Sequence, residues 1–85
     1  MESYRLLIKP SAVKELEGLP LEDRRRVAKR MRALAGQPRP QGSEKLRGEE
    51  LYRIRQGDYR VVYEINDRER TVTIMLIGHR RDVYR

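Results

Sequence analysis

The sequence predicts an α+β fold, in which a helical hairpin covers one face of a mostly antiparallel four-stranded sheet. Three observations lead to this prediction. The elements occur in the order β-α-α-β-β-β, the two helical segments are amphipathic, and the three closing strands are separated by short turns. At 85 residues the chain has the length of one domain. We therefore expect residues 1–85 to form a single two-layer domain.

The first strand and the first helix are predicted over residues 4–19. Apolar and polar residues alternate over residues 4–9, which is typical of a half-buried strand. Pro10 should end this strand, and Ser11 is the expected N-cap of a short helix that runs to about Leu19. Pro20 marks the break after it.

A longer helix is predicted from about Leu21 to Ala35. Glu22 and Asp23 lie in its first turn, which suits the helix dipole. Gly36 is the expected C-terminal cap, and residues 37–43 should form a loop. The apolar face of this helix is formed by Val27, Ala28, Met31, Leu34 and Ala35.

Three strands close the chain, over Leu51–Arg55, Tyr59–Ile65 and about Thr71–Gly78. Residues 56–58 form the expected hairpin turn between the first two, and residues 66–70 form a polar turn before the third. The third strand is apolar on both faces, which predicts an interior position in the sheet. Simple alternation places Val72, Ile74 and Leu76 on one face and Met75 and Ile77 on the other.

The charge of the chain favours a polyanionic partner. Lys and Arg number 20 against 13 Asp and Glu, the net charge is +7, and the isoelectric point is about 10.2. Nucleic acid is the leading partner class for such a chain, but a charge-rich solvated surface or an acidic protein partner would also fit. No cysteine is present and no apolar run is long enough to span a membrane, so we expect a cytoplasmic protein.

Strand alternation predicts where several arginines point. Tyr52 and Ile54 share one face of their strand, whereas Arg53 and Arg55 share the other. In the next strand Arg60 lies opposite an apolar face. Because the helices need an apolar surface to pack on, the three arginines should project from the uncovered face. A solvated sheet face that carries arginines for solubility is the alternative reading.

Two further arginines, Arg80 and Arg81, directly follow the last strand and should extend this cluster. The planar guanidinium group binds two phosphate oxygens at once. A metal site is not expected, because His79 is the single histidine and no cysteine is present. We also expect no cofactor, since no glycine-rich phosphate loop occurs.

One reaction needs neither a metal nor a protein nucleophile. In RNA the 2′-hydroxyl attacks the adjacent phosphate, and arginines can stabilise the charge that develops on the phosphorane. Arginine rarely gives up its proton, so another group must transfer protons. The candidates near the cluster are Tyr84, His79, Glu64 and Lys45.

Three segments carry a resemblance to a known family. They are Lys45-Leu46-Arg47-Gly48, the stretch from Tyr52 to Tyr63 (YRIRQGDYRVVY), and the closing stretch from Ile77 to Tyr84 (IGHRRDVY). The sequence resembles the RelE family of the RelE/ParE superfamily of toxins over nearly its whole length. The resemblance implies a RelE-like fold and a metal-independent endoribonuclease that cleaves messenger RNA in the ribosomal A site. It also implies a RelB-type antitoxin as partner.

The resemblance also assigns roles to individual residues. The catalytic residues it implies are Arg53, Arg55, Arg60, Arg80 and Tyr84. Further RNA contacts are expected from Lys45, Arg47 and Arg81. The most familiar family member has lysines where this chain has Arg53 and Arg55. Two alternatives therefore stay open: a non-catalytic RNA-binding or inactive toxin homologue, and a ParE-like gyrase inhibitor.

Overall fold

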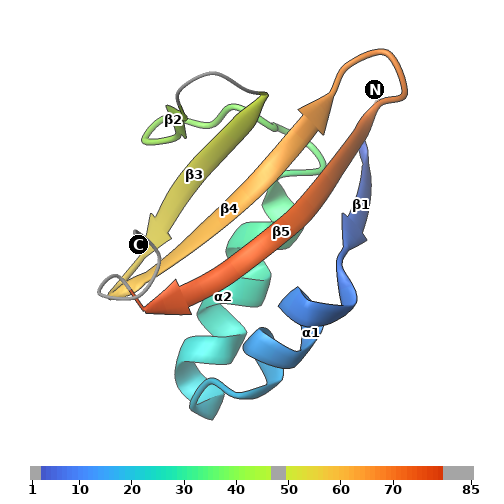
Figure 1. The fold of residues 1–85 in the computed structure, drawn as a ribbon. Helices are drawn as coiled ribbons and strands as arrows, with labels where there is room; N and C mark the ends of the chain where they lie inside the picture. Colours follow the sequence, from blue (N-terminus) through green and yellow to red (C-terminus); the bar gives the residue numbers. More distant parts are fainter. Residues whose placement is uncertain (1–2, 47–49, 80–85) are drawn as a thin grey trace.

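The computed structural model describes residues 3–46 and 50–79 (Figure 1). The chain runs from a short strand through two helices into a series of strands. These elements are β1 (Arg5–Ile8), α1 (Pro10–Glu17), α2 (Leu21–Ala33), β2 (Glu44–Lys45), β3 (Leu51–Gln56), β4 (Tyr59–Asn66) and β5 (Thr71–His79). Within the described part of the chain, neither helix is both long and apolar enough to cross a membrane.

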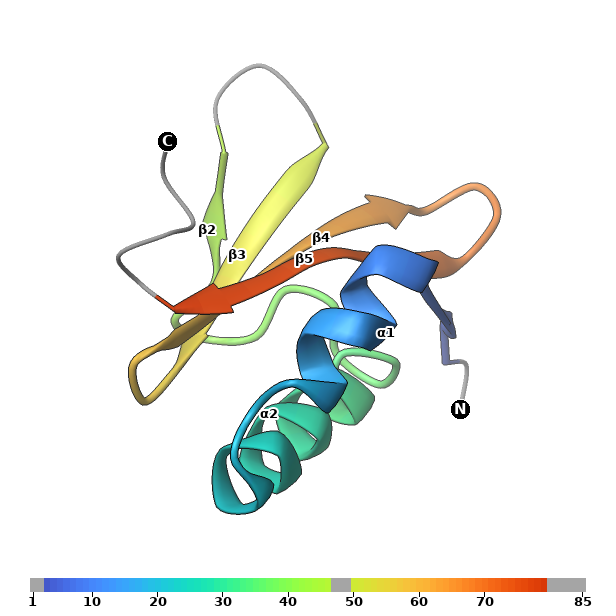
Figure 2. The ribbon, with the colours of Figure 1, turned by 60° about the horizontal axis from the view of Figure 1, so that its bottom comes forward.

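The five strands form one sheet in the order β1-β5-β4-β3-β2. β1 runs parallel to β5, and all other neighbours are antiparallel. Both helices lie against the same face of the sheet (Figure 2). The predicted α+β architecture and the interior position of β5 are confirmed. The additional strand is β2, two residues that pair with β3 at the edge of the sheet.

The core lies between the helices and the sheet. Val27 and Met31 of α2 are buried, and so are the side chains that β3, β4 and β5 direct toward the helices. The largest fully buried side chains are Tyr63, Met31, Leu34, Ile54, Ile74, Val27, Val61 and Val72. Neither of the two described helices lies on the opposite face of the sheet (Figure 2), which carries the polar side chains of β3 and β4.

A bulge changes the predicted alternation of β5. Val62 pairs with Leu76 but Tyr63 pairs with Ile74, so Met75 is an extra residue in the strand. After the bulge, Ile77 returns to the core and is 2% exposed. The prediction that Leu76 shares a face with Ile74 is therefore wrong, because the inserted residue reverses the order of faces.

Both helices differ at their ends from the predictions. β1 ends before Pro10, as predicted, but Pro10 is itself the first residue of α1, and Lys9 occupies the N-cap without a side-chain hydrogen bond. Ser11 is thus not the cap, since proline fits the first helical position, where its missing N–H is not needed. α2 ends at Ala33 with Leu34 as its C-cap, so Gly36 does not cap it.

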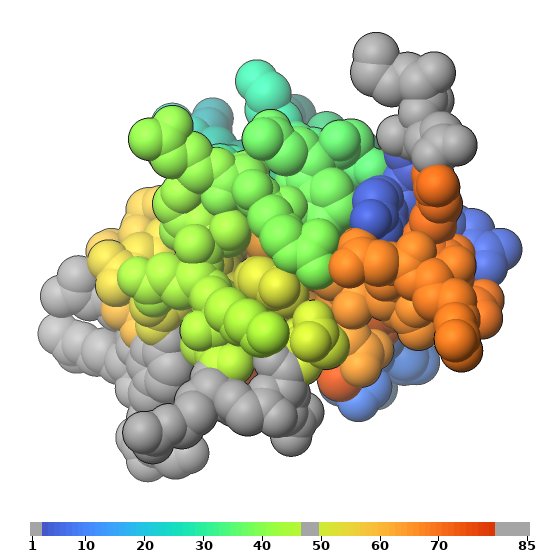
Figure 3. Space-filling view, turned by 90° about the horizontal axis from the view of Figure 1, so that it is seen from above, coloured from blue at the N-terminus to red at the C-terminus, as the bar shows by residue number. Residues whose placement is uncertain are grey.

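Hydrogen bonds hold the segment that follows α2 against the sheet. The Tyr63 hydroxyl donates to the Pro38 carbonyl at 2.7 Å. Arg39 donates to Asp67 at 2.9 Å and to the Tyr52 hydroxyl at 3.0 Å. Tyr4 donates to the same Asp67 carboxylate at 2.6 Å. Figure 3 shows this segment, in green, beside the β4–β5 turn in orange. The contacts fix the chain just before β2.

Candidate functional site

The arginines of β3 and β4 gather on the sheet face opposite α1 and α2. Arg55 and Arg60 are paired directly across the two strands, and Arg53 lies two residues from Arg55 on the same face. Their strand neighbours Tyr52 and Ile54 are buried in the core. We call Arg53, Arg55 and Arg60 the arginine cluster.

The hairpin between β3 and β4 sets the spacing of the cluster. Its loop is the dipeptide Gly57-Asp58, and Gly57 has a φ of +62°, which a residue with a side chain rarely adopts. A two-residue loop fixes the register of the strands. As a result, Gln56 faces Tyr59 and Arg55 faces Arg60.

The three guanidinium groups influence one another electrostatically. Burial lowers the pKa of Arg53, and the positive charges of Arg60 and Arg55 lower it further. Only 11% of the Arg53 side chain is exposed. Arginine stays protonated even so, so the cluster concentrates positive charge on a partly desolvated surface. An anion bound here would relieve the repulsion.

A carboxylate already partners one member of the cluster. Glu44 of β2 pairs in register with Arg53 and forms an ion pair with it. The Glu44 side chain remains 56% exposed, in contrast to its partner. Glu44 is not among the site residues that the sequence predicts. The only signal was its place beside Lys45, and a two-residue strand has no periodicity that would predict which of them faces Arg53.

An apolar strip borders the cluster. Val62 lies between Arg53 and Leu76 in one row across β3, β4 and β5, and it is 8% exposed. In the next row Arg60 faces Gly78, a residue without a side chain. Because Val62 is buried and Gly78 has no side chain, the guanidinium groups are the feature of this face that suits a nucleic acid, through its phosphates.

Two candidate proton carriers lie away from the cluster. His79 pairs with Tyr59 and their rings meet edge to face at 5.7 Å, on the face that packs on the helices. Glu64, by contrast, lies on the same face as the cluster, four residues along β4 from Arg60 and two residues from Val62, the cross-strand partner of Arg53. Lys45 pairs with Tyr52, which alternates onto the sheet face opposite the arginine cluster. The ammonium group of Lys45 is 3.5 Å from a carboxylate oxygen of Glu50.

Four of the expected site residues lie outside the described residues. They are Arg47, Arg80, Arg81 and Tyr84. Their expected roles remain predictions. His79, the last described residue, lies at the end of β5 and pairs with Tyr59, the first residue of β4.

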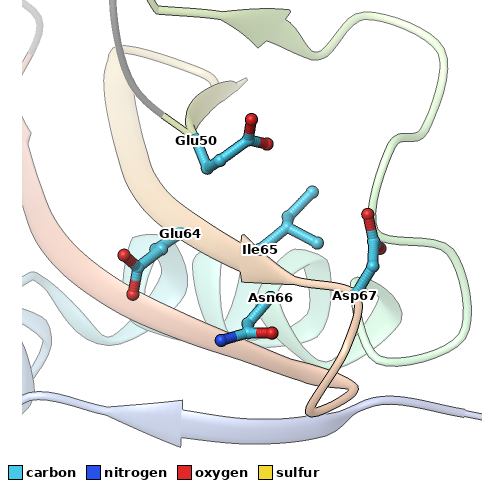
Figure 4. A pocket seen from close by; sticks show the side chains of 5 residues that line it. All are labelled: Glu50, Glu64, Ile65, Asn66 and Asp67. Atoms are coloured by element: carbon cyan, nitrogen blue, oxygen red, sulfur yellow. The ribbon is translucent and has the colours of Figure 1, made fainter.

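A pocket of about 360 Å³ lies at the far end of β4 from the arginine cluster (Figure 4). It is lined by Glu50, Glu64, Ile65, Asn66 and Asp67. Asp67 is engaged by Arg39, which lowers the pKa of its carboxyl group. No group of three or more potential metal ligands occurs within residues 3–46 and 50–79.

Comparison with known proteins identifies the family. The family model described as ParE toxin of type II toxin-antitoxin system, parDE, matches residues 6–84. A search of curated proteins finds no match.

Solved structures of RelE toxins and their complexes are similar to this chain. The archaeal RelE–RelB complex from Pyrococcus horikoshii OT3 matches with 34% identity and a TM-score of 0.83, over 94% of this chain and 98% of that chain. The RelBE2 toxin–antitoxin complex from Mycobacterium tuberculosis matches with 28% identity and a TM-score of 0.80, over 91% and 98%. The isolated E. coli RelE toxin matches with 29% identity and a TM-score of 0.79, over 89% and 83%. The chain therefore belongs to the ParE toxin family of type II toxin–antitoxin systems, within the RelE/ParE superfamily.

Proposed function

We propose that this toxin is a metal-independent endoribonuclease that cleaves messenger RNA in the A site of the ribosome. The observation that carries the proposal is the arginine cluster, three guanidinium groups on an open sheet face with one of them paired to a carboxylate. The resemblance to RelE, with 34% identity to the archaeal toxin complex, supports the same activity.

The cluster suits the charge changes of RNA cleavage. The 2′-oxygen attacks phosphorus and loses its proton to a base, and the bond to the 5′-oxygen breaks as that oxygen takes up a proton. The products are a 2′,3′-cyclic phosphate and a 5′-hydroxyl. The phosphorane that forms on the way carries an additional negative charge. Arg53, Arg55 and Arg60 can donate hydrogen bonds to its oxygens, and such donors stabilise a transition state more than a ground state.

The proton transfers need other groups. Tyr84 is the proposed proton carrier and Arg80 the proposed fourth phosphate ligand. Lys45, Arg47 and Arg81 would add contacts to the RNA backbone. In this proposal the ribosome presents the messenger RNA in the conformation for attack, the toxin acts in the cytoplasm, and a RelB-type antitoxin covers the basic surface.

A cleavage assay on programmed ribosomes tests the proposal. Parent protein, R60A and R60K are added to ribosomes that carry a defined messenger RNA, and primer extension maps the new 5′ ends. The matched control is R68A, which removes an exposed arginine from the β4–β5 turn at the other end of the sheet. Loss of one transition-state donor should slow cleavage at least a hundredfold, while R68A should cleave like the parent. Equal cleavage by R60A and the parent would overturn the proposal.

Gyrase inhibition is the second candidate, because the matching family model is that of ParE. An assay of DNA supercoiling by purified gyrase separates the two. Inhibited supercoiling together with intact messenger RNA on the ribosome would favour this alternative. If neither effect appears but RNA still binds, the protein is a non-catalytic RNA-binding homologue.

A further inference from the structure

A second basic site lies on the helix side of the molecule. A pocket of about 380 Å³ is formed where α2 meets the end of β3, and it is lined by Arg26, Lys29, Arg30, Ala33 and Gln56. The four α2 residues have the i, i+3, i+4, i+7 spacing of one stripe along a helix. Three of the five lining residues therefore bring a positive charge to the same concave surface.

Little negative charge opposes these cations. Among the described residues, the one carboxylate that forms an ion pair with them is Glu22, whose oxygen is 3.8 Å from Arg26. Both side chains of that pair are mostly exposed, and such pairs contribute little. Ala33 is the apolar side chain among the residues that line the pocket. The site thus offers a concentrated positive charge to an anion of modest size.

The pocket is connected to the arginine cluster around the edge of the sheet. Arg30 donates from Nη2 to the main-chain carbonyl of Arg55 at 3.3 Å. β2 pairs with β3 only at Tyr52 and Arg53, so it does not cover the Arg55–Gln56 end of the strand. Arg55 projects from the open face, and its neighbour Gln56 lines the pocket. The two basic surfaces are thus joined, among the described residues, through the adjacent β3 residues Arg55 and Gln56.

We propose that the α2 pocket is a phosphate subsite for single-stranded RNA. A strand that lies across the arginine cluster would pass around the end of β3 and place a later backbone phosphate among Arg26, Lys29 and Arg30. The inference rests on the proposed function, because the strand it extends is the one held by the cluster. Arginine and lysine donate charge-assisted hydrogen bonds to phosphate oxygens. The subsite contributes to affinity and placement of the strand, and not to the chemical step.

Binding of non-cleavable RNA of two lengths tests the subsite. The probes are fluorescein-labelled 2′-O-methyl RNAs of 3 and 12 nucleotides, measured by fluorescence anisotropy over a salt series. The test variant is R26Q/K29Q, which leaves Arg30 and its bond to Arg55 in place. The matched control is R25Q/R32Q, which removes the same charge from exposed positions of the same helix that do not line the pocket. Glutamine is about as good a helix former as the residues it replaces.

We expect R26Q/K29Q to weaken binding of the longer RNA about tenfold and to reduce its salt slope by about 1.4, the value for two phosphate contacts on a single strand. Binding of the 3-nucleotide RNA should not change, because it is too short to reach both surfaces. The control should lose less than twofold. Equal losses in both double variants would reduce the effect to net charge and overturn the subsite. So would unchanged binding by R26Q/K29Q, or no binding of the longer RNA by the parent.

The outcome is separable from that of the cleavage assay. If R60A still cleaves messenger RNA but the length-dependent loss is found, the proposed reaction fails and the subsite stands as an RNA-binding site. If cleavage depends on Arg60 but R26Q/K29Q binds both RNAs like the parent, the subsite alone fails.

Discussion

Glu44 and Arg53 face each other across β2 and β3 and form an ion pair on the open face of the sheet. The contact occupies a guanidinium group that the proposed reaction needs for phosphate. Because most of the Glu44 side chain is exposed, the carboxylate can leave Arg53 when a stronger anion arrives. Glu44 thus neutralises part of the cluster in the free protein, and it also opposes the approach of RNA.

Replacing this carboxylate should strengthen RNA binding. In E44Q the competition for Arg53 is lost while the size of the side chain is kept. A half-exposed ion pair contributes about 0.2–1 kcal/mol, so affinity for a non-cleavable RNA should rise by about 1.4- to fivefold. Fluorescence anisotropy at low salt measures the change.

The control for this prediction is E69Q, which removes the same charge from the β4–β5 turn. Glu69 is exposed and lies beyond the end of β4 that is remote from the β3–β4 hairpin. Its replacement should raise affinity only by the small effect of net charge. An equal rise in both variants would mean that the contact between Glu44 and Arg53 has no specific role.

The sequence was sufficient to predict the arginine cluster because the β3–β4 hairpin is regular. Each strand alternates without interruption, so the positions of Arg53, Arg55 and Arg60 follow from the buried Tyr52 and Ile54. Simple alternation did not predict the faces of β5 correctly. Residues 74–77 are all apolar, so their pattern fits either set of faces, and no glycine or proline marks the bulge at Met75.

Features that depend on tertiary contact could not be predicted. β2 is two residues long and is a strand only because β3 lies beside it, so neither the strand nor the pair of Glu44 with Arg53 has a signature in the sequence. The contact of Arg30 with the carbonyl of Arg55 depends on where α2 crosses the sheet. In the sequence, nothing distinguishes Arg30 from the other arginines of α2.

The bulge in β5 predicts opposite sensitivities for two adjacent residues. Ile77 is 2% exposed and belongs to the core, whereas Leu76 lies on the other face beside Val62. We expect I77A to lower the free energy of unfolding by about 2–4 kcal/mol and L76A by about 1 kcal/mol. Urea unfolding followed by circular dichroism measures both values. If I77A does not fold, I77V should still cost about 1 kcal/mol. A larger loss for L76A than for the Ile77 variants would contradict the bulge.

The Asp67 network predicts a loss of stability in acid. Hydrogen bonds from Arg39 and then from Tyr4 lower the pKa of the Asp67 carboxyl group below its ordinary value. The stabilisation is therefore complete above the pKa of the unfolded chain, about 3.9, and is lost as the pH falls through the lower folded value. In D67N, stability at neutral pH should fall, and its further decrease below about pH 4 should be shallower than in the parent.

Thermal unfolding between pH 2 and pH 7 measures this dependence. The control is D58N, which replaces an aspartate in the β3–β4 turn with a residue that turns also accept. It should keep the acid-dependent slope of the parent. If D67N and the parent lose stability in parallel below pH 4, the network does not contribute to acid sensitivity.

Tyr63 predicts a second loss of stability, at alkaline pH. Burial raises the pKa of this tyrosine to about 12, and its hydroxyl donates to the Pro38 carbonyl at 2.7 Å. In the unfolded chain a tyrosine ionises near pH 10. Stability should therefore be complete below about pH 10 and should be lost as the pH rises through the folded value of about 12.

The variant Y63F removes the ionisable hydroxyl and nearly preserves the shape of the ring. At pH 7 it should lower the free energy of unfolding by about 1–2 kcal/mol, because the hydrogen bond is lost and the Pro38 carbonyl is left without that donor. Between pH 10 and pH 12 its stability should fall less steeply than that of the parent. Urea unfolding at each pH measures both effects. If the free energy of unfolding falls equally steeply with pH in the two proteins, ionisation of Tyr63 does not contribute to the alkaline loss of stability. The Tyr63 hydroxyl would then act only through its hydrogen bond to Pro38, which holds residues 37–43 against the sheet.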